Sequence, residues 1–234
     1  MAQEPYQSGF AFDPGDFASN PDPRAPCVLV LDASGSMSGQ PIQELNDGLR
    51  TYQKELVADP LAARRVELAV IRFGGGVEVV QDFVSPAHYV PSELPAEGET
   101  PLAEAVIRAI HLLEQRKTVY RANGISYYRP WVFLFTDGEP TDDRERWKLA
   151  QEAVRRGEAE GKFTFFAFGV AGANFARLSE LTGARSPLQL KGTTFREFFL
   201  WLSNSQRRVS QSTVGANVRL LPPTGDSGWG EIPT

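Results

Sequence analysis

Short apolar runs, rich in β-branched and aromatic residues, recur along the chain between longer segments of mixed polarity. Four of them, each five to eight residues long, are predominantly apolar rather than alternating, and they cover residues 27–31, 66–73, 131–135 and 163–168. This pattern is typical of strands buried on both faces of a parallel sheet. A fifth run at 77–83 follows three glycines at 74–76 and predicts an edge strand entered through a tight hairpin.

Helical periods occupy the segments between these runs. In two segments the apolar residues recur every three or four positions, as on a helix that buries one face. They are Ile42, Leu45, Leu49, Tyr52 and Leu56 in the first segment, and Leu102, Val106, Ile110 and Leu113 in the second. Further helices are predicted at 142–159, 174–181 and 194–206. Strands that alternate with helices predict a three-layer, Rossmann-like α/β fold, with a doubly wound, mostly parallel sheet and one antiparallel edge strand.

The two ends of the chain lack a sustained hydrophobic period. Residues 1–25 are rich in Pro, Asp, Gly and Ser and predict an N-terminal arm, whereas residues 213–234 predict a C-terminal tail. Aromatic side chains that are suited to anchor these ends are Phe10, Phe12, Phe17 and Trp229. A chain of 234 residues therefore accommodates one α/β domain at 26–212 between two extensions.

Composition and charge narrow the class of protein. With 41% hydrophobic and 23% charged residues, the chain has the composition of an ordinary globular protein. Its net charge of -5 predicts no general attraction to nucleic acid or to an anionic membrane. Cys27 is the only cysteine, which excludes an internal disulfide and thiolate metal sites. We expect a cytoplasmic protein, because the N-terminus lacks a secretory pattern and no window approaches 18 apolar residues.

Two aspartates each follow a predicted buried strand. Asp32 comes directly after the first strand, and Asp137 follows the run at 131–135, separated from it by one residue. In an open α/β sheet, ligands bind outside the carboxyl ends of the strands. We therefore expect both carboxylates to lie at the same edge of the sheet.

Hydroxyl groups accompany these carboxylates in the sequence. In the segment from Asp32 to Ser36, alternate residues present a carboxylate and the hydroxyls of Ser34 and Ser36, and Gly35 eases the tight loop. Thr100 precedes Pro101 at a predicted helix start, in a loop able to reach the same edge. Two carboxylates, three hydroxyls and water match the six oxygens that Mg²⁺ requires at about 2.0–2.1 Å. The pattern predicts a Mg²⁺ or Mn²⁺ site with an open coordination position for an acidic group.

At these residues the sequence resembles the von Willebrand factor type A domain with its metal-ion-dependent adhesion site. Asp32, Ser34, Ser36, Thr100 and Asp137 match the five positions of that motif in order. The runs at 127–131, 136–142 and 198–203 are similar to the bacterial tellurium-resistance TerY-type branch. The resemblance implies a metal held by these five residues and a protein partner that donates a Glu or Asp. For the branch, it implies stress-response operons and protein kinase or phosphatase partners.

Each candidate ligand also has an ordinary structural interpretation. Ser34 and Ser36 can cap the helix that follows them, and Thr100 before Pro101 has a capping pattern. Asp142 is expected to cap the next helix rather than to support the metal, and Glu139 and Glu99 have a similarly weak claim to an outer role. The glycines at 74–76 lack the Lys and Ser/Thr of a phosphate-binding loop, and the isolated His88 and His111 are assigned to no site.

Three functions fit these observations. The first is a non-enzymatic, metal-dependent protein-binding module, because the oxygen cluster has no evident nucleophile and base. The second is a Mg²⁺-dependent phosphohydrolase with Asp32 as the nucleophile, although Ser34 stands where that chemistry wants a second acid. The third is a structural module in which the metal only stabilises the fold. The first is our preferred hypothesis.

Overall fold

The protein is described from a computed structural model. The described residues are 17, 19–137, 139–170, 172–183, 185–190 and 195–218, together with the backbone of 230–231.

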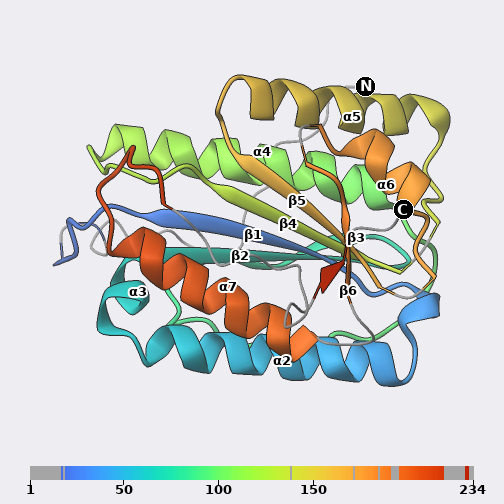
Figure 1. The fold of residues 1–234 in the computed structure, drawn as a ribbon, viewed down its shortest axis with the longest axis horizontal. Coiled ribbons are helices and arrows are strands. Elements are labelled where there is room, and N and C mark those ends of the chain that lie inside the picture. The colour runs from blue at the N-terminus through green and yellow to red at the C-terminus, as the bar shows by residue number, and fades with distance from the viewer. Residues whose placement is uncertain are drawn as a thin grey trace.

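A seven-stranded sheet forms the middle layer of the molecule, in the order β3-β2-β1-β4-β5-β6-β7 (Figure 1). The strands are β1 (Ala25–Asp32), β2 (Val66–Phe73), β3 (Val77–Val84), β4 (Trp131–Thr136), β5 (Thr164–Gly169), β6 (Leu188–Leu190) and β7 (Gly230–Glu231). Neighbouring strands from β2 to β6 pair in parallel. The two edge strands are antiparallel, β3 to β2 and β7 to β6.

The predicted doubly wound, mostly parallel α/β fold is confirmed, and the glycines at 74–76 form the predicted hairpin between β2 and β3. Two strands were not predicted. β6 and β7 contain three and two residues, which is too short for a hydrophobic period to emerge. Because β7 is antiparallel, the sheet has a second antiparallel edge, and its residues lie in the segment interpreted from the sequence as a tail.

Helices cover both faces of the sheet (Figure 1). The helices α2 (Gln40–Val57), α3 (Pro60–Arg65) and α7 (Phe195–Ser210) lie on one face, and α4 (Leu102–Ala122), α5 (Arg144–Ala159) and α6 (Phe175–Leu181) lie on the other. The short α3 was not predicted. It begins at Pro60, and the side chain of Asp59 caps it by accepting hydrogen bonds from Leu61 N and Ala62 N. Across the described part of the chain, no helix is both long enough and apolar enough to cross a membrane.

The core consists of two layers, one on each side of the sheet. Along β1, Cys27, Leu29 and Leu31 pack toward α2 and α7, whereas Val28 and Val30 pack toward α4 and α5. All eight residues of β1 are buried. Burial on both faces explains why the run from Cys27 to Leu31 is apolar without alternation.

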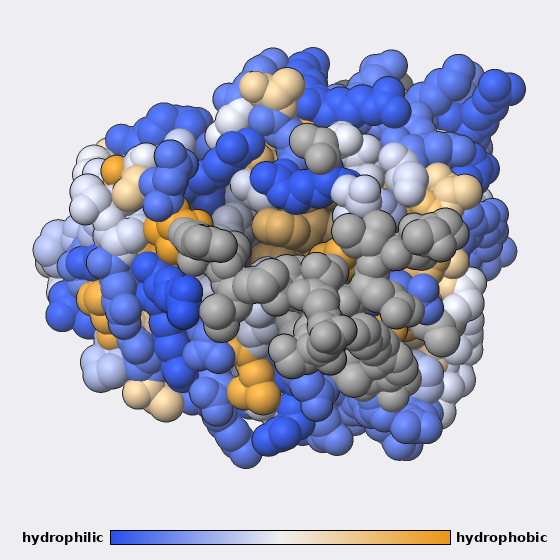
Figure 2. Space-filling model, in the orientation of Figure 1, coloured by the Kyte–Doolittle hydropathy of each residue, from blue (hydrophilic) through white to orange (hydrophobic). Residues whose placement is uncertain are grey.

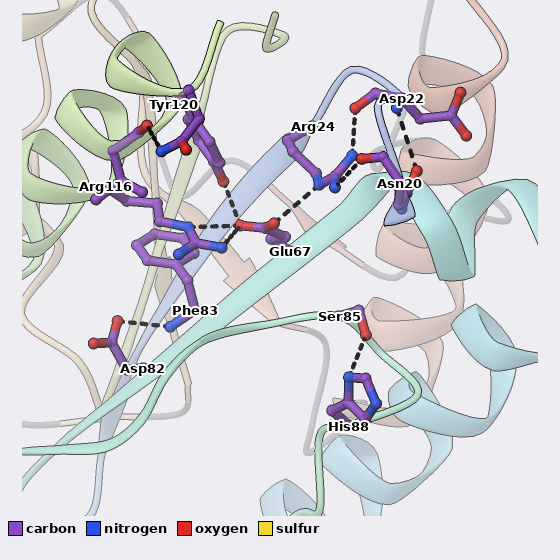
Figure 3. Close-up of polar contacts among 12 residues, drawn as sticks. Asn20, Asp22, Arg24, Glu67, Asp82, Phe83, Ser85, His88, Arg116 and Tyr120 are labelled. Atoms are coloured by element: carbon purple, nitrogen blue, oxygen red, sulfur yellow. Dashed lines mark hydrogen bonds and ion pairs between the residues drawn. The ribbon is translucent and has the colours of Figure 1, made fainter. Parts of the chain in front are cut away.

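A buried ion-pair network lies at the amino end of β2, away from the carboxyl ends of the strands (Figure 3). Glu67 accepts hydrogen bonds from Arg24 Nε at 3.0 Å, from Arg116 Nε at 2.7 Å and from the Tyr120 hydroxyl at 2.5 Å. Phe17 is buried against this network, with both guanidinium groups 5.2 Å from its ring centre. Phe17 therefore anchors its end of the chain, as expected, while Phe10, Phe12 and Trp229 lie outside the described residues.

Candidate metal centre

Asp32, the last residue of β1, has a fully buried side chain whose two oxygens both accept hydrogen bonds. Its Oδ1 accepts from the backbone N–H of Ser34 at 2.9 Å and from the Ser34 hydroxyl at 2.5 Å. Its Oδ2 accepts from the hydroxyl of Thr136 at 2.5 Å. These three donors hold the carboxylate in one orientation at the carboxyl end of the strand.

The two serines connect this carboxylate to the second aspartate. Ser34 Oγ and Ser36 Oγ are 3.0 Å apart, and the Ser36 hydroxyl donates to Asp137 Oδ1 at 2.6 Å. Asp137 follows the last residue of β4, which pairs directly with β1. The structure thus brings Asp32, Ser34, Ser36 and Asp137 together at one edge of the sheet, as predicted from their positions after two buried strands.

Thr100 belongs to a loop that packs between the segment carrying the two serines and the segment after Asp137. Its backbone oxygen accepts from Thr141 N at 3.0 Å, and its N–H donates to Thr141 Oγ1 at 3.2 Å. Two residues earlier, the oxygen of Gly98 accepts from the N–H of Gly35 at 3.0 Å. Thr100 is itself buried. Its loop is therefore tied both to the strip that carries the serines and to the segment after Asp137.

Close backbone contacts fix these loops against one another. A side chain at Gly74 would place its Cβ 2.2 Å from the oxygen of Ala33, and one at Gly98 would place its Cβ 2.3 Å from the Cα of Gly75. Gly98 also has a φ of 71°, which disfavours other residues. Glycine at these positions is required for the segments to stack by their backbones.

Burial raises the pKa of both aspartates. For Asp32 the loss of hydration is the largest cause, opposed by the hydrogen bonds from Ser34 and Thr136, and the nearby charge of Asp137 raises the pKa further. For Asp137 burial again raises the pKa, opposed by the hydrogen bond from Ser36. Two desolvated carboxylates close together favour a compensating positive charge.

The neighbouring carboxylates have structural partners. Asp142 accepts from Ala103 N at 2.8 Å and Glu104 N at 3.1 Å, so it caps α4. The expectation that it caps the next helix was wrong, because Asp143 caps α5 by accepting from Arg146 N. Glu139 accepts from Asn174 Nδ2 at 2.7 Å, which ties its loop to the start of α6. Asp142 thus positions the helix that follows Thr100 rather than the helix that follows itself.

The cluster has the chemistry of a hard-cation site. Within the described ranges, no group of three or more His, Cys, Asp or Glu side chains is placed to hold a metal, so hydroxyl groups must complete any ligand set here. Adjacent oxygens of an octahedral Mg²⁺ shell with bonds of ~2.1 Å are separated by about 3 Å, and Ser34 Oγ and Ser36 Oγ are 3.0 Å apart. Carboxylate and hydroxyl oxygens suit Mg²⁺ or Mn²⁺ better than softer metals. The residues present fit such an ion.

Thr136 is the member of this cluster that sequence reasoning missed. It is the last residue of β4 and directly precedes Asp137, so a strand pattern gives no reason to separate it from the buried residues before it. The signal available was its register, because the pairing of Leu31 with Phe135 places Thr136 beside Asp32. A polar residue at the end of a buried strand, opposite an aspartate, identifies a hydrogen-bond partner.

The fold and the cluster together define a doubly wound α/β domain with an oxygen-rich binding edge. Residues 27–198 match the von Willebrand factor type A domain, and the chain belongs to this family. It is 27% identical to the pig inter-alpha-trypsin inhibitor heavy chain H4 over 150 residues, which cover 61% of this chain and 15% of that protein. The chain thus spans less than a fifth of the length of that relative.

Two solved structures show the same fold at low sequence identity. The pilus adhesin SpaC from Lactobacillus rhamnosus GG has a TM-score of 0.63 and 12% identity, over 80% of this chain and 31% of that chain. The ArnB paralog VWA2 from Sulfolobus acidocaldarius has a TM-score of 0.51 and 16% identity, over 78% of this chain and 45% of that chain. At sequence identities this low, the comparison shows a shared fold and nothing about function.

Proposed function

We propose that the protein is a non-enzymatic, metal-dependent protein-binding module that acts as a scaffold or adaptor. The observation that carries this proposal is the convergence of the Ser34, Ser36 and Asp137 side chains, with oxygens 3.0 Å and 2.6 Å apart, at the carboxyl edge of the sheet. Family membership supports it, because the five motif positions are all present in this chain.

The metal ligands in this proposal are Asp32, Ser34, Ser36, Thr100 and Asp137. A bound Mg²⁺ or Mn²⁺ supplies a positive charge with an open position that a Glu or Asp side chain, or a phosphate, of a protein partner fills. Three of the protein ligands are neutral hydroxyls, so the ion keeps much of its attraction for an incoming anion. The hydrogen bond from Thr136 keeps Asp32 oriented toward this cluster.

The geometry favours binding over phosphoryl transfer. A nucleophilic carboxylate needs an oxygen that can reach the substrate, yet Asp32 is fully buried and both its oxygens accept hydrogen bonds. A general acid two residues later is also missing, since that position is Ser34. Turnover of a generic phosphate ester by the wild type, lost in Asp32→Asn, would instead establish a phosphohydrolase.

The proposal extends to the cellular role. The similarity of the runs at 127–131, 136–142 and 198–203 to the TerY-type branch supports a role in bacterial stress response or tellurium resistance. Protein kinase or phosphatase components are then the expected partners, and neither nucleic acid nor a membrane is. A single buried thiol, Cys27, fits the reducing cytoplasm.

Metal titration followed by partner capture tests the function. We expect Mn²⁺ to bind the wild type in calorimetry, and Asp137→Ala and Ser36→Ala to weaken binding by at least ~10-fold, as the loss of a direct ligand does. Glu139→Gln, a change at a nearby carboxylate outside the ligand set, should bind Mn²⁺ like the wild type. Asp137 is the better target because removing the buried Asp32 also removes three hydrogen bonds.

Pull-downs from a bacterial lysate, with Mg²⁺ or with chelator, then separate the functions. Capture that requires Mg²⁺ and is lost in Asp137→Ala and Asp32→Ala supports the binding module. Capture that persists unchanged in these variants and in chelator contradicts it. A melting temperature raised by Mg²⁺ without any metal-sensitive partner would indicate a structural metal instead.

A further inference from the structure

A groove of about 400 Å³ lies beside the candidate metal centre, at the turn between β2 and β3. Glycines 74–76 and Gly98 line its walls, and Arg72, Glu78 and Glu97 contribute the charged side chains. Gly74 contacts the backbone of Ala33, and Gly98 accepts a hydrogen bond from Gly35. The groove therefore adjoins the segment that carries Ser34 and Ser36.

The charges of this groove are predominantly negative. Arg72 Nε is 2.8 Å from Glu78 Oε2, and Arg72 Nη1 is 3.4 Å from Glu97 Oε1. The arginine side chain is only 18% exposed, whereas the two glutamates are 58% and 60% exposed. Two accessible carboxylates share one recessed guanidinium, so the groove presents net negative charge to an incoming group.

The loops around the metal centre extend this acidic surface. The segments at 33–39, 97–101, 137–143 and 170–174 contain no Lys or Arg, while they include Glu97, Glu99, Glu139 and Asp143. A partner that brings a carboxylate to this edge therefore meets the repulsion of these acidic side chains before it reaches the proposed metal. Positive charge next to that carboxylate would offset the repulsion.

Two backbone amides of the groove are engaged, which makes an anion a poor match for it. Gly74 N donates to Gly76 O at 2.9 Å, and Gly75 N donates to Glu99 O at 3.0 Å, so these amides are not available to cradle a phosphate. An apolar partner is also a poor match. Across the described residues the exposed large hydrophobics are Val57, Val90, Leu149 and Val214, which belong to separate segments. Among the coloured atoms of Figure 2, hydrophilic residues predominate and hydrophobic residues form small, separate patches.

We propose that this groove binds a Lys or Arg of the protein partner whose acidic residue reaches the metal centre. The inference rests on the proposed function and specifies its ligand: an extended segment in which a basic residue flanks the metal-binding Glu or Asp. An extended chain advances about 3.3 Å per residue, so the two residues are expected near each other in that segment. Glu78 and Glu97 are the specificity-determining residues of this contact.

A peptide library with one fixed Glu and four randomised positions on each side is the probe. It is selected on the immobilised full chain in Mg²⁺ and eluted with chelator. We expect Lys and Arg to be enriched on at least one side of the Glu. The enrichment should disappear with the double variant Glu78→Gln, Glu97→Gln and persist with Glu160→Gln, a half-exposed carboxylate in an ion pair with Lys162 before β5, at the opposite edge.

Single peptides from the selection then give the size of the effect. Replacing the basic residue by Ala should weaken binding to the wild type about 3-fold, as for an exposed ion pair, and should leave binding to the double variant unchanged. Gly76→Trp provides a steric test, because a Cβ at Gly76 meets open space while the residue lines the groove. It should weaken basic-flanked peptides and leave Mn²⁺ binding intact.

The outcomes separate this inference from the function on which it rests. Glu-dependent and Mg²⁺-dependent peptides without a basic preference, or with a preference that the double variant retains, overturn the groove assignment and leave the binding module in place. A library in which no peptide depends on both Glu and Mg²⁺ overturns the binding module, and the groove assignment with it. Basic enrichment lost only in the double variant supports both.

Discussion

The hydroxyl of Thr136 donates a hydrogen bond to Oδ2 of Asp32 at 2.5 Å, joining the carboxyl ends of β4 and β1. Thr136 is buried and directly precedes Asp137. The carboxyl end of β4 therefore supplies both the donor that orients Asp32 and, in the next residue, the second aspartate. Hydrogen bonds from neutral hydroxyls thus offset part of the lost hydration of the buried Asp32 carboxylate.

Thr136→Val should destabilise the protein by about 1–3 kcal/mol, because it keeps the shape of the side chain and leaves a buried carboxylate oxygen without its donor. Chemical denaturation in the absence of divalent metal measures the change. Thr118→Val is the matched control, since this exposed hydroxyl makes only solvent-accessible bonds within α4, donating to Glu114 O and accepting from Arg121 Nη2, and it should change stability by less than about 0.5 kcal/mol. Equal effects of the two substitutions would contradict the role of Thr136.

The convergence of Asp32, Ser34, Ser36 and Asp137 was predictable because each sits at a position defined by local pattern. Asp32 and Asp137 follow apolar runs, and parallel pairing alone brings such strand ends together. Thr136 and Asp142 were missed or misassigned because their partners are distant in sequence: Asp32 lies 104 residues from Thr136, and Ala103 lies 39 residues from Asp142. Hydrogen bonds at this separation depend on register and loop geometry, which hydrophobic periodicity does not report.

The helices and strands also divide into those that the sequence predicts and those that it does not. Long segments with a repeated period, such as α2 with its buried stripe from Ile42 to Leu56, were predicted well. The elements that escaped, α3, β6 and β7, have six residues or fewer. Elements this short are stabilised by contacts with the rest of the molecule rather than by a pattern of their own.

Gly48→Ala should destabilise the protein although alanine favours helix formation by about 1 kcal/mol. Gly48 lies in α2 against α7, and a Cβ there would be 2.5 Å from Cδ2 of the buried Phe199. Overpacking of this kind costs about 1–3 kcal/mol. The melting temperatures of Gly48→Ala and Gly76→Ala, each compared with that of the wild type, test this prediction. The second variant should be at least as stable as the wild type, because its Cβ meets open space.

Cys27 should be inert to thiol reagents in the folded protein. It is fully buried in β1, and burial raises its pKa to about 12, so the reactive thiolate is scarce at pH 8. A disulfide exchange reagent should react at the unfolded rate in denaturant and at least ~10³-fold more slowly in native buffer. Native labelling as fast as in denaturant would mean that β1 opens freely, which the central position of this strand argues against.

The contact between Trp147 and Glu180 should make the packing of α5 on α6 sensitive to acid. Trp147 Nε1 donates to Glu180 Oε2 at 2.9 Å, and Arg177 Nη1 lies 3.1 Å from the same oxygen. The hydrogen bond from Trp147, followed by that from Arg177, lowers the pKa of Glu180. A carboxyl group with a lower pKa in the folded state stabilises the protein above its unfolded pKa, and this contribution is lost as the pH falls through the folded value.

Glu180→Gln should therefore lower the melting temperature at neutral pH, and the difference from the wild type should shrink as the pH falls below the ordinary Glu pKa of about 4.3 and Glu180 becomes protonated. The indole N–H resonance of Trp147, assigned with Trp147→Phe, should shift over the same range in the wild type only. Glu152→Gln changes an exposed carboxylate on the same helix and should leave that resonance in place. If the difference in melting temperature between the wild type and Glu180→Gln grew as the pH fell, the neutral form of Glu180 would be the stabilising one. The role assigned to its carboxylate would then be wrong.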